Sequence, residues 1–169
     1  MTDELAPLRA RVAVLEAREE IRSLRNRFHE YVNTNRWDEI GGLFADNAVL
    51  DYATLGQAGG RSAIAEYFGS MPRRIPTGPG ELPFVRQFIH GHTVDVDPGG
   101  ETASGTSSLF ATPVYDGRSF LFSGAFADRY VRLEGEWLFA SVTLDIWYSV
   151  PLEGGWAQPD RNQMTLERP

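Results

Sequence analysis

The sequence Asn33-Thr34-Asn35-Arg36-Trp37-Asp38, followed by Leu43-Phe44-Ala45-Asp46-Asn47-Ala48-Val49-Leu50-Asp51-Tyr52, marks the passage from a helical to a strand-rich part of the chain. Before it, apolar residues recur at spacings of three and four, which predicts an amphipathic helix with one buried face: Leu8, Val12, Leu15, Ile21, Leu24, Phe28 and Tyr31 or Val32. The Asn33-Thr34-Asn35 run ends this helix, because Asn and Thr side chains compete for backbone hydrogen bonds. Residues 37–44 are expected to form a second short helix, and residues 48–52 a strand.

Further along, turn signals divide the chain into one more helix and a series of strands. Residues 56–60 form a glycine-rich turn, residues 63–71 a third helix, and residues 72–83, with four prolines, a loop of the kind that covers a binding site. Strands are predicted at 87–97, 101–112, 118–133 and 136–148, joined by tight hairpins. Helices followed by a hairpin-linked antiparallel sheet indicate an α+β fold. We therefore expect one domain over residues 1–152, in which residues 1–16 could be a helical arm for a partner, and an extended tail over 153–169.

The composition excludes several classes of function. The 169 residues include no cysteine and three histidines, and 16 Lys plus Arg stand against 23 Asp plus Glu, for a net charge of −7. Without cysteine there is no disulfide, thiolate metal site or cysteine nucleophile. The acidic balance argues against nucleic acid, and no apolar run is long enough to span a membrane. The acidic start at Met1–Glu4 is unlike a signal peptide, so a cytoplasmic protein is expected. We predict no metal and no other cofactor.

The order of motifs carries a resemblance to a known family. The stretch quoted above is followed by Gly60-Arg61-Ser62-Ala63-Ile64 and later by Gly135-Glu136-Trp137-Leu138-Phe139-Ala140. Together they resemble the SnoaL-like branch of the NTF2-like (cystatin-like) superfamily, and within it the scytalone dehydratase-like proteins, from about residue 17 to residue 147. The resemblance implies a cone: a curved, mostly antiparallel sheet and three N-terminal helices enclosing a pocket. It also implies a homo-oligomer, a dimer or trimer, and gives the 20 aromatic residues a place as pocket lining.

Enzymes of this family commonly use an Asp–His dyad, and this chain departs from it at both positions. The Asp position matches Asn33 and the His position matches Gln87, while a second family histidine falls near Leu121 and its asparagine partner near Phe126. The first-strand tyrosine is kept as Tyr52. Asn and Gln form hydrogen bonds but exchange no proton near neutral pH. They can hold and polarise a carbonyl or hydroxyl group, so another group must move the proton.

The titratable groups near the expected pocket leave alternatives open. His90 and His92 alternate with Val94 and Val96, so strict alternation places them on the buried face, although a bulge near Gly91 would invert this. His29 either reaches the pocket or is half-exposed on the helix. Asp145 is either an inward acid or, more simply, an outward carboxylate. We expect Asp128 to pair locally or face solvent.

Two kinds of function follow from this reading. The first is a cofactor-independent lyase, isomerase or cyclase acting on a hydrophobic, ring-containing metabolite of polyketide, terpenoid or steroid type. Its catalytic residues would be Asn33, Tyr52 and Gln87, which polarise a ligand oxygen, and His90, which moves the proton. Its ligand-binding residues would be Tyr31, Phe88, Leu121, Phe126 and Trp147. The alternative is a non-catalytic ligand-binding or assembly subunit of the same fold, such as the small subunit of an oxygenase.

Overall fold

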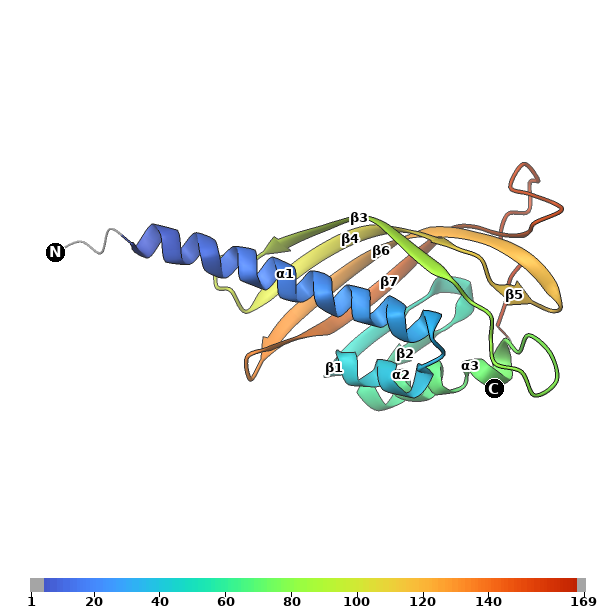
Figure 1. Cartoon of the computed structure of the whole chain (residues 1–169), viewed down its shortest axis with the longest axis horizontal. Helices are drawn as coiled ribbons and strands as arrows, with labels where there is room; N and C mark the ends of the chain where they lie inside the picture. Colours follow the sequence, from blue (N-terminus) through green and yellow to red (C-terminus); the bar gives the residue numbers. More distant parts are fainter. Residues whose placement is uncertain (1–4, 167–169) are drawn as a thin grey trace.

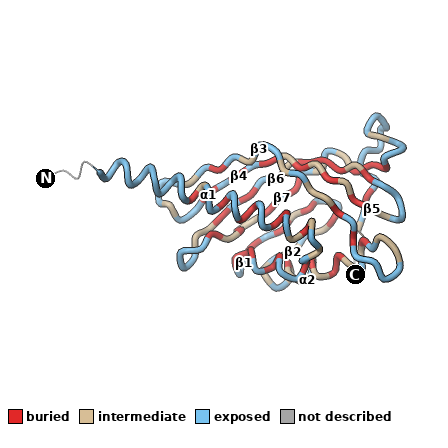
Figure 2. The backbone as a smooth tube through the Cα atoms, in the orientation of Figure 1, coloured by how far each residue is buried: buried red, intermediate tan, exposed pale blue. Residues whose placement is uncertain are grey.

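Helix α1 (Ala6–Asn33) is long, and only its second half lies on the rest of the protein. The computed structural model describes residues 5–166. Leu5 and residues 6–16 of α1 are all exposed and project beyond the sheet, whereas the following residues bury one stripe against it (Figures 1 and 2). The buried stripe has the predicted spacing: Ala17, Ile21, Leu24, Phe28 and Val32. The predicted helix and its end at Asn33 are therefore confirmed; residues 1–4 of the expected arm lie outside the described residues.

The elements after α1 form the base of the molecule. A 3-10 helix, η1 (Trp37–Leu43), takes the place of the predicted second helix and leads into β1 (Phe44–Asp51). A short η2 (Ala53–Leu55) and β2 (Gln57–Gly59) precede helix α2 (Arg61–Gly69), which is the predicted third helix. The one-turn helix α3 (Met71–Arg74) enters the proline-rich segment that we expected to be entirely loop. That expectation is wrong for this turn, because Pro72 stands in its first turn, where a missing N–H costs nothing.

The sheet is curved and mostly antiparallel, as predicted. The long strands β3 (Gln87–Val96), β4 (Thr102–Ala111), β6 (Arg118–Leu133) and β7 (Glu136–Pro151) lie within three residues of the predicted ranges. The strand order is β2-β1-β7-β6-β4-β3, and the short β5 (Val114–Tyr115) pairs with β6. All pairs are antiparallel except β1 with β7, which is parallel. With the helices packed on its concave face, the sheet confirms the α+β fold class (Figure 1).

Strand β3 contains a bulge that decides which side chains face the helices. His90 pairs with Ser108 and Thr93 with Thr106, so the register shifts between them at Gly91, whose φ is +61°. Gln87 and Ile89 before the bulge, and His92, Val94 and Val96 after it, are partly or fully buried. The expectation that His90 and His92 share a face is wrong, since the extra residue inverts the alternation and leaves His90 exposed.

The segment after β7 folds back onto the sheet. The Ser149 N–H donates to the Arg161 carbonyl at 2.6 Å, and the Gln163 N–H donates to the Ser149 carbonyl at 2.8 Å. These bonds bring Met164 into the core, where it is 5% exposed. The expected extended tail thus closes one side of the domain with a side chain of its own; residues 167–169 lie outside the described residues.

Candidate functional site

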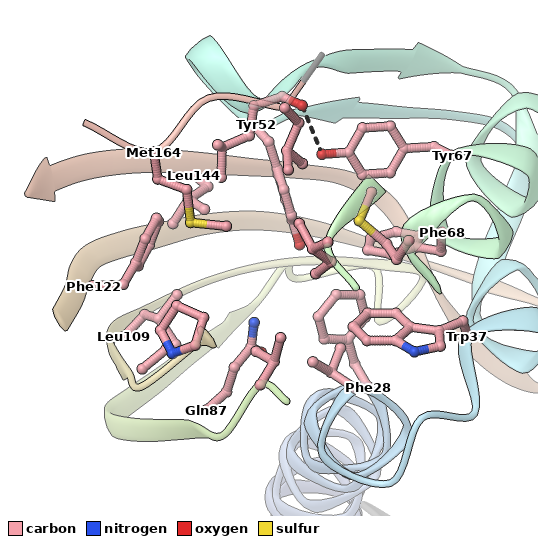
Figure 3. Close-up of a pocket in the computed structure, with 18 residues that line it drawn as sticks. Phe28, Trp37, Tyr52, Tyr67, Phe68, Gln87, Leu109, Phe122, Leu144 and Met164 are labelled. Carbon is pink, nitrogen blue, oxygen red and sulfur yellow. Dashed lines mark hydrogen bonds between the residues drawn. The ribbon is translucent and has the colours of Figure 1, made fainter. Parts of the chain in front are cut away.

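A cavity lies between α1, the sheet and α2, and its wall is almost entirely apolar. The wall includes Phe28, Trp37, Phe68, Leu109, Phe122 and Leu144, and Met164 from the tail closes it (Figure 3). The cavity encloses about 600 Å³ of space free of protein atoms, a volume that includes open solvent at its mouth. Such an apolar, aromatic-walled space is typical of a site for a small hydrophobic molecule.

Tyrosine hydroxyls and one amide are the main polar side-chain groups on this wall. Tyr52 is buried, and its hydroxyl has no hydrogen-bond partner within residues 5–166. Tyr67 donates its hydroxyl to the Leu55 carbonyl at 3.0 Å (Figure 3). Burial raises the pKa of Tyr52 above its usual value and the pKa of Tyr67 to about 12, so both hydroxyls stay protonated and can donate.

Gln87 is the amide on the wall, and α1 holds it from two sides. The Asn33 side chain accepts from the Gln87 backbone N–H at 2.7 Å and donates to the Gln87 carbonyl at 3.0 Å. The Gln87 side-chain oxygen lies 2.6 Å from Nδ1 of His29, one turn before Asn33 on the helix. Asn33 therefore fixes the start of β3 through these two bonds, and Asn33 itself does not line the cavity.

His29, which the sequence placed either in the pocket or half-exposed on the helix, is in neither place: it is buried and bonded to Gln87 but does not line the cavity. It is 6% exposed and packs edge-on against Phe28 at 5.2 Å between ring centroids. Burial lowers the pKa of His29 well below 6.5, and the charge of Arg25 lowers it further, so the imidazole is neutral at pH 7. The signal for it was its position four residues before Asn33, which places both on one helical face.

A fully buried ion pair, Arg25 with Asp128, lies one turn before His29 on α1. Arg25 Nε donates to the Asp128 carboxylate at 3.0 Å, a second Arg25 nitrogen also donates to Asp128, and the Tyr130 hydroxyl donates to Asp128 at 2.8 Å. His92 Nε2 lies 3.2 Å from the Tyr130 hydroxyl. The expectation that Asp128 pairs locally or faces solvent is wrong, because β6 points this side chain at α1, 103 residues away in sequence.

Of the predicted site residues, Tyr52 and Gln87 line the cavity and the others do not. His90 is exposed because of the bulge. Phe88 and Trp147 are 51% and 49% exposed on the sheet, and Leu121 alternates with the wall residue Phe122. Two more predicted residues pack against arginines instead of lining the cavity. The guanidinium carbon of Arg36 lies 4.2 Å from the ring centroid of Tyr31, and that of Arg25 lies 4.2 Å from the ring centroid of Phe126. Asp145 is exposed, as the simpler expectation had it.

Neither a metal site nor a membrane-crossing helix is found in the described part of the chain. Among residues 5–166, no group of three or more His, Asp or Glu side chains is placed to hold a metal ion. Within the same residues, no helix is long and apolar enough to cross a membrane.

Comparison with known proteins agrees with the fold. The family model of the SnoaL-like domain matches residues 13–143. A candidate scytalone dehydratase from Novosphingobium aromaticivorans has a similar structure (TM-score 0.70, 15% identity, covering 95% of this chain and 99% of that one). A hexachlorocyclohexane dehydrochlorinase, LinA type 2, is also similar (TM-score 0.75, 15% identity, covering 88% of this chain and 97% of that one). So is an NTF2-like protein with a cystatin-like fold from N. aromaticivorans (TM-score 0.67, 21% identity, covering 93% of this chain and 96% of that one). At these identities the structural likeness establishes the fold alone. No curated protein matches the sequence significantly.

Proposed function

Because the chain belongs to the SnoaL-like domain family, we propose that it binds a small, hydrophobic, ring-containing metabolite in the cavity and acts on it as a cofactor-independent lyase or isomerase. The observation that carries this proposal is an apolar cavity with two polar groups for a ligand oxygen: the amide of Gln87 and the hydroxyl of Tyr52, which has no hydrogen-bond partner among the described residues. Two of the similar structures are described as a dehydratase and a dehydrochlorinase, names that denote loss of a small molecule from the substrate.

The residues at the cavity suggest how such a reaction would proceed. Tyr52 and Gln87 would polarise a ligand oxygen, and the apolar wall would hold the ring in a fixed orientation, which alone can lower a barrier by several kcal/mol. His29, neutral and 2.6 Å from the Gln87 side-chain oxygen, would orient this amide from behind without reaching the ligand itself. All 16 basic residues are arginines, so no lysine of this chain can form a Schiff base with a ketone.

A second candidate function is ligand binding without catalysis. It is favoured by one observation: within residues 5–166, no His, Asp or Glu side chain lines the cavity itself. A binding protein needs only the shape of the wall and the two hydrogen-bonding groups. The two candidates share a ligand class and differ in whether the bound compound changes.

Incubation with a panel of cyclic ketones and alcohols of one to three rings separates the two. We expect native mass spectrometry to show a one-to-one complex, and liquid chromatography to show a new product. Gln87→Met should lower the turnover number about 100-fold, as loss of one transition-state hydrogen bond does. His90→Leu, which alters an exposed position, is the control. A complex whose ligand is recovered unchanged supports the binding protein, and no complex with any compound refutes both.

Self-association is also part of the proposal. Leu8, Val12 and Leu15 of the projecting part of α1 are 56%, 43% and 60% exposed and lie on one helical face. Scattered apolar residues are ordinary on a surface, but a stripe at spacings of four and three resembles a coiled-coil seam. A second copy of the chain would cover it, giving the dimer or trimer expected from the sequence.

A further inference from the structure

We infer that Gln87 makes the cavity selective for ligands whose polar group is a hydrogen-bond acceptor, such as a ring ketone, and that His29 and Asn33 are positioning residues that hold Gln87 as a donor. This inference rests on the proposed ligand cavity and adds the class of ligand that it takes. It depends on the direction of one amide, which the surrounding hydrogen bonds determine.

The backbone of Gln87 cannot rotate to present its own polar groups. Its N–H and its carbonyl are both bonded to the Asn33 side chain, at 2.7 Å and 3.0 Å. Asn33 ends α1 and Gln87 begins β3, so these two bonds fix the start of the strand to the end of the helix. The side-chain amide is then the one part of Gln87 that can meet a ligand.

His29 decides which end of that amide faces the cavity. A neutral imidazole carries one N–H, and Nε2 of His29 is buried without a hydrogen-bond partner in the described chain. A buried N–H without a partner is rarer than a buried lone pair without one. The proton therefore belongs on Nδ1, which donates to the Gln87 side-chain oxygen 2.6 Å away. The charge of Arg25, one turn earlier, helps to keep the imidazole neutral, with this single N–H.

With its oxygen turned to His29, Gln87 presents its N–H groups to a ligand. Figure 3 shows its nitrogen pointing into the cavity, opposite the apolar wall. A ketone oxygen accepts from it and brings no hydrogen that needs a partner. An alcohol in the same place brings an O–H hydrogen that the N–H groups of Gln87 cannot accept, so this hydrogen would have to reach the oxygen of Tyr52 or Tyr67. An ammonium group offers Gln87 no acceptor at all.

Acetophenone, 1-phenylethanol and ethylbenzene test this selectivity, because they share one skeleton and differ only in C=O, CHOH or CH₂. We expect acetophenone to bind wild type about 5- to 10-fold more tightly than ethylbenzene, as one net hydrogen bond allows, and more tightly than the alcohol. In ¹⁵N–¹H spectra the side-chain NH₂ signal of Gln87 should move with acetophenone. Gln87→Met should bind all three compounds alike, whereas Gln158→Met, at an exposed glutamine, should behave as wild type.

Variants of His29 test the positioning role separately. Asparagine places its side-chain NH₂ near the position of Nδ1, so His29→Asn should keep the preference for acetophenone, and His29→Leu should lose it while still binding ethylbenzene. If wild type binds the three compounds equally, or if Gln87→Met keeps the preference for acetophenone, the inference about Gln87 is overturned, whereas the proposal that the cavity binds a ligand is still supported. If wild type binds none of them, the proposed cavity fails and the inference fails with it.

Discussion

The buried charge of Arg25 is balanced by a single carboxylate, that of Asp128. Both side chains are fully buried, and the guanidinium also lies over the rings of Phe126 and Phe139, at 4.2 Å and 4.9 Å from their centroids. Taking two charges out of water costs free energy that only close pairing offsets. This pair joins the middle of α1 to β6, and its loss should be felt by the whole domain.

Asp128→Asn should lower the free energy of unfolding by about 3–5 kcal/mol, because it leaves the Arg25 charge buried without a counter-charge. Urea denaturation measures the change. Asp95→Asn, which weakens the exposed ion pair with Arg18 at 3.9 Å, should leave the unfolding curve within error of wild type. The double variant Arg25→Met/Asp128→Leu should recover most of the loss. Equal, small effects of the Asp128 and Asp95 changes would contradict this account.

His29 gives the stability of the protein a defined pH dependence. Burial and the charge of Arg25 lower its pKa in the folded protein, whereas the unfolded chain titrates near pH 6.5. Below pH 6.5 the unfolded state therefore binds more protons than the folded state, so stability is full above this pH and falls as the pH falls through it. The pKa of His92 is lowered in the same direction, by burial and then by Arg25.

Urea denaturation at pH 7.5 and 5.5 measures this effect in wild type and in His29→Asn. Between these pH values we expect the free energy of unfolding to fall more in wild type than in His29→Asn, because the variant lacks the imidazole. The difference should reach up to about 1.4 kcal/mol for each pH unit below 6.5. His92 and the carboxylates stay in both proteins and cancel in the difference. The prediction is wrong if both proteins lose the same free energy of unfolding between the two pH values.

Among the elements, β3 shows how one residue sets the chemistry of a whole strand. The bulge at Gly91 keeps Gln87 and His92 on the inner face although they are five positions apart, a spacing that places residues of a regular strand on opposite faces. Gly91 adopts a left-handed backbone with φ of +61°, which costs other residues free energy through contact of Cβ with the backbone.

Gly91→Ala should lower the free energy of unfolding by about 1–2 kcal/mol. Because the side chain of the new residue meets nothing within 4 Å, the loss would come from backbone strain alone. Thermal or urea unfolding gives the value. Gly99→Ala, at a turn glycine without a left-handed φ and equally open, is the matched control and should change stability little. An equal loss in both variants would rule out the strained bulge.

The elements also show what the sequence could and could not predict. Periodicity and turn residues predicted α1 and the hairpins, because helix faces and tight turns are local properties; β6 occupies the predicted residues 118–133. The bulge at Gly91 was foreseen only as an alternative, since one glycine does not reveal its φ. The parallel pairing of β1 with β7 and the contact of Arg25 with Asp128 join segments about 100 residues apart, and no local pattern reports them.

Over the whole molecule, the cavity is assembled from segments spread along most of the chain. Phe28 comes from α1, Tyr52 from the residue that follows β1, Gln87 from β3 and Met164 from the tail. Alignment with the family pattern could identify Tyr52 and Gln87, which occupy positions that it names. His29 and Met164 occupy no such position, and only the packing of α1 and the return of the tail bring them to the site.

The projecting half of α1 leads to the last prediction, which concerns assembly. Its stripe of Leu8, Val12 and Leu15 is exposed, as are all of residues 5–16 (Figure 2). Analytical ultracentrifugation of wild type at micromolar concentration should therefore show a dimer or trimer. Leu8→Glu/Leu15→Glu should shift it to the monomer without changing the urea unfolding curve of the domain, because neither side chain is buried in one copy. Ala10→Glu, on the opposite face of the same helix, should leave the oligomer intact. A wild-type monomer, or an oligomer that survives the Leu8 and Leu15 changes, would show that this stripe is not the interface.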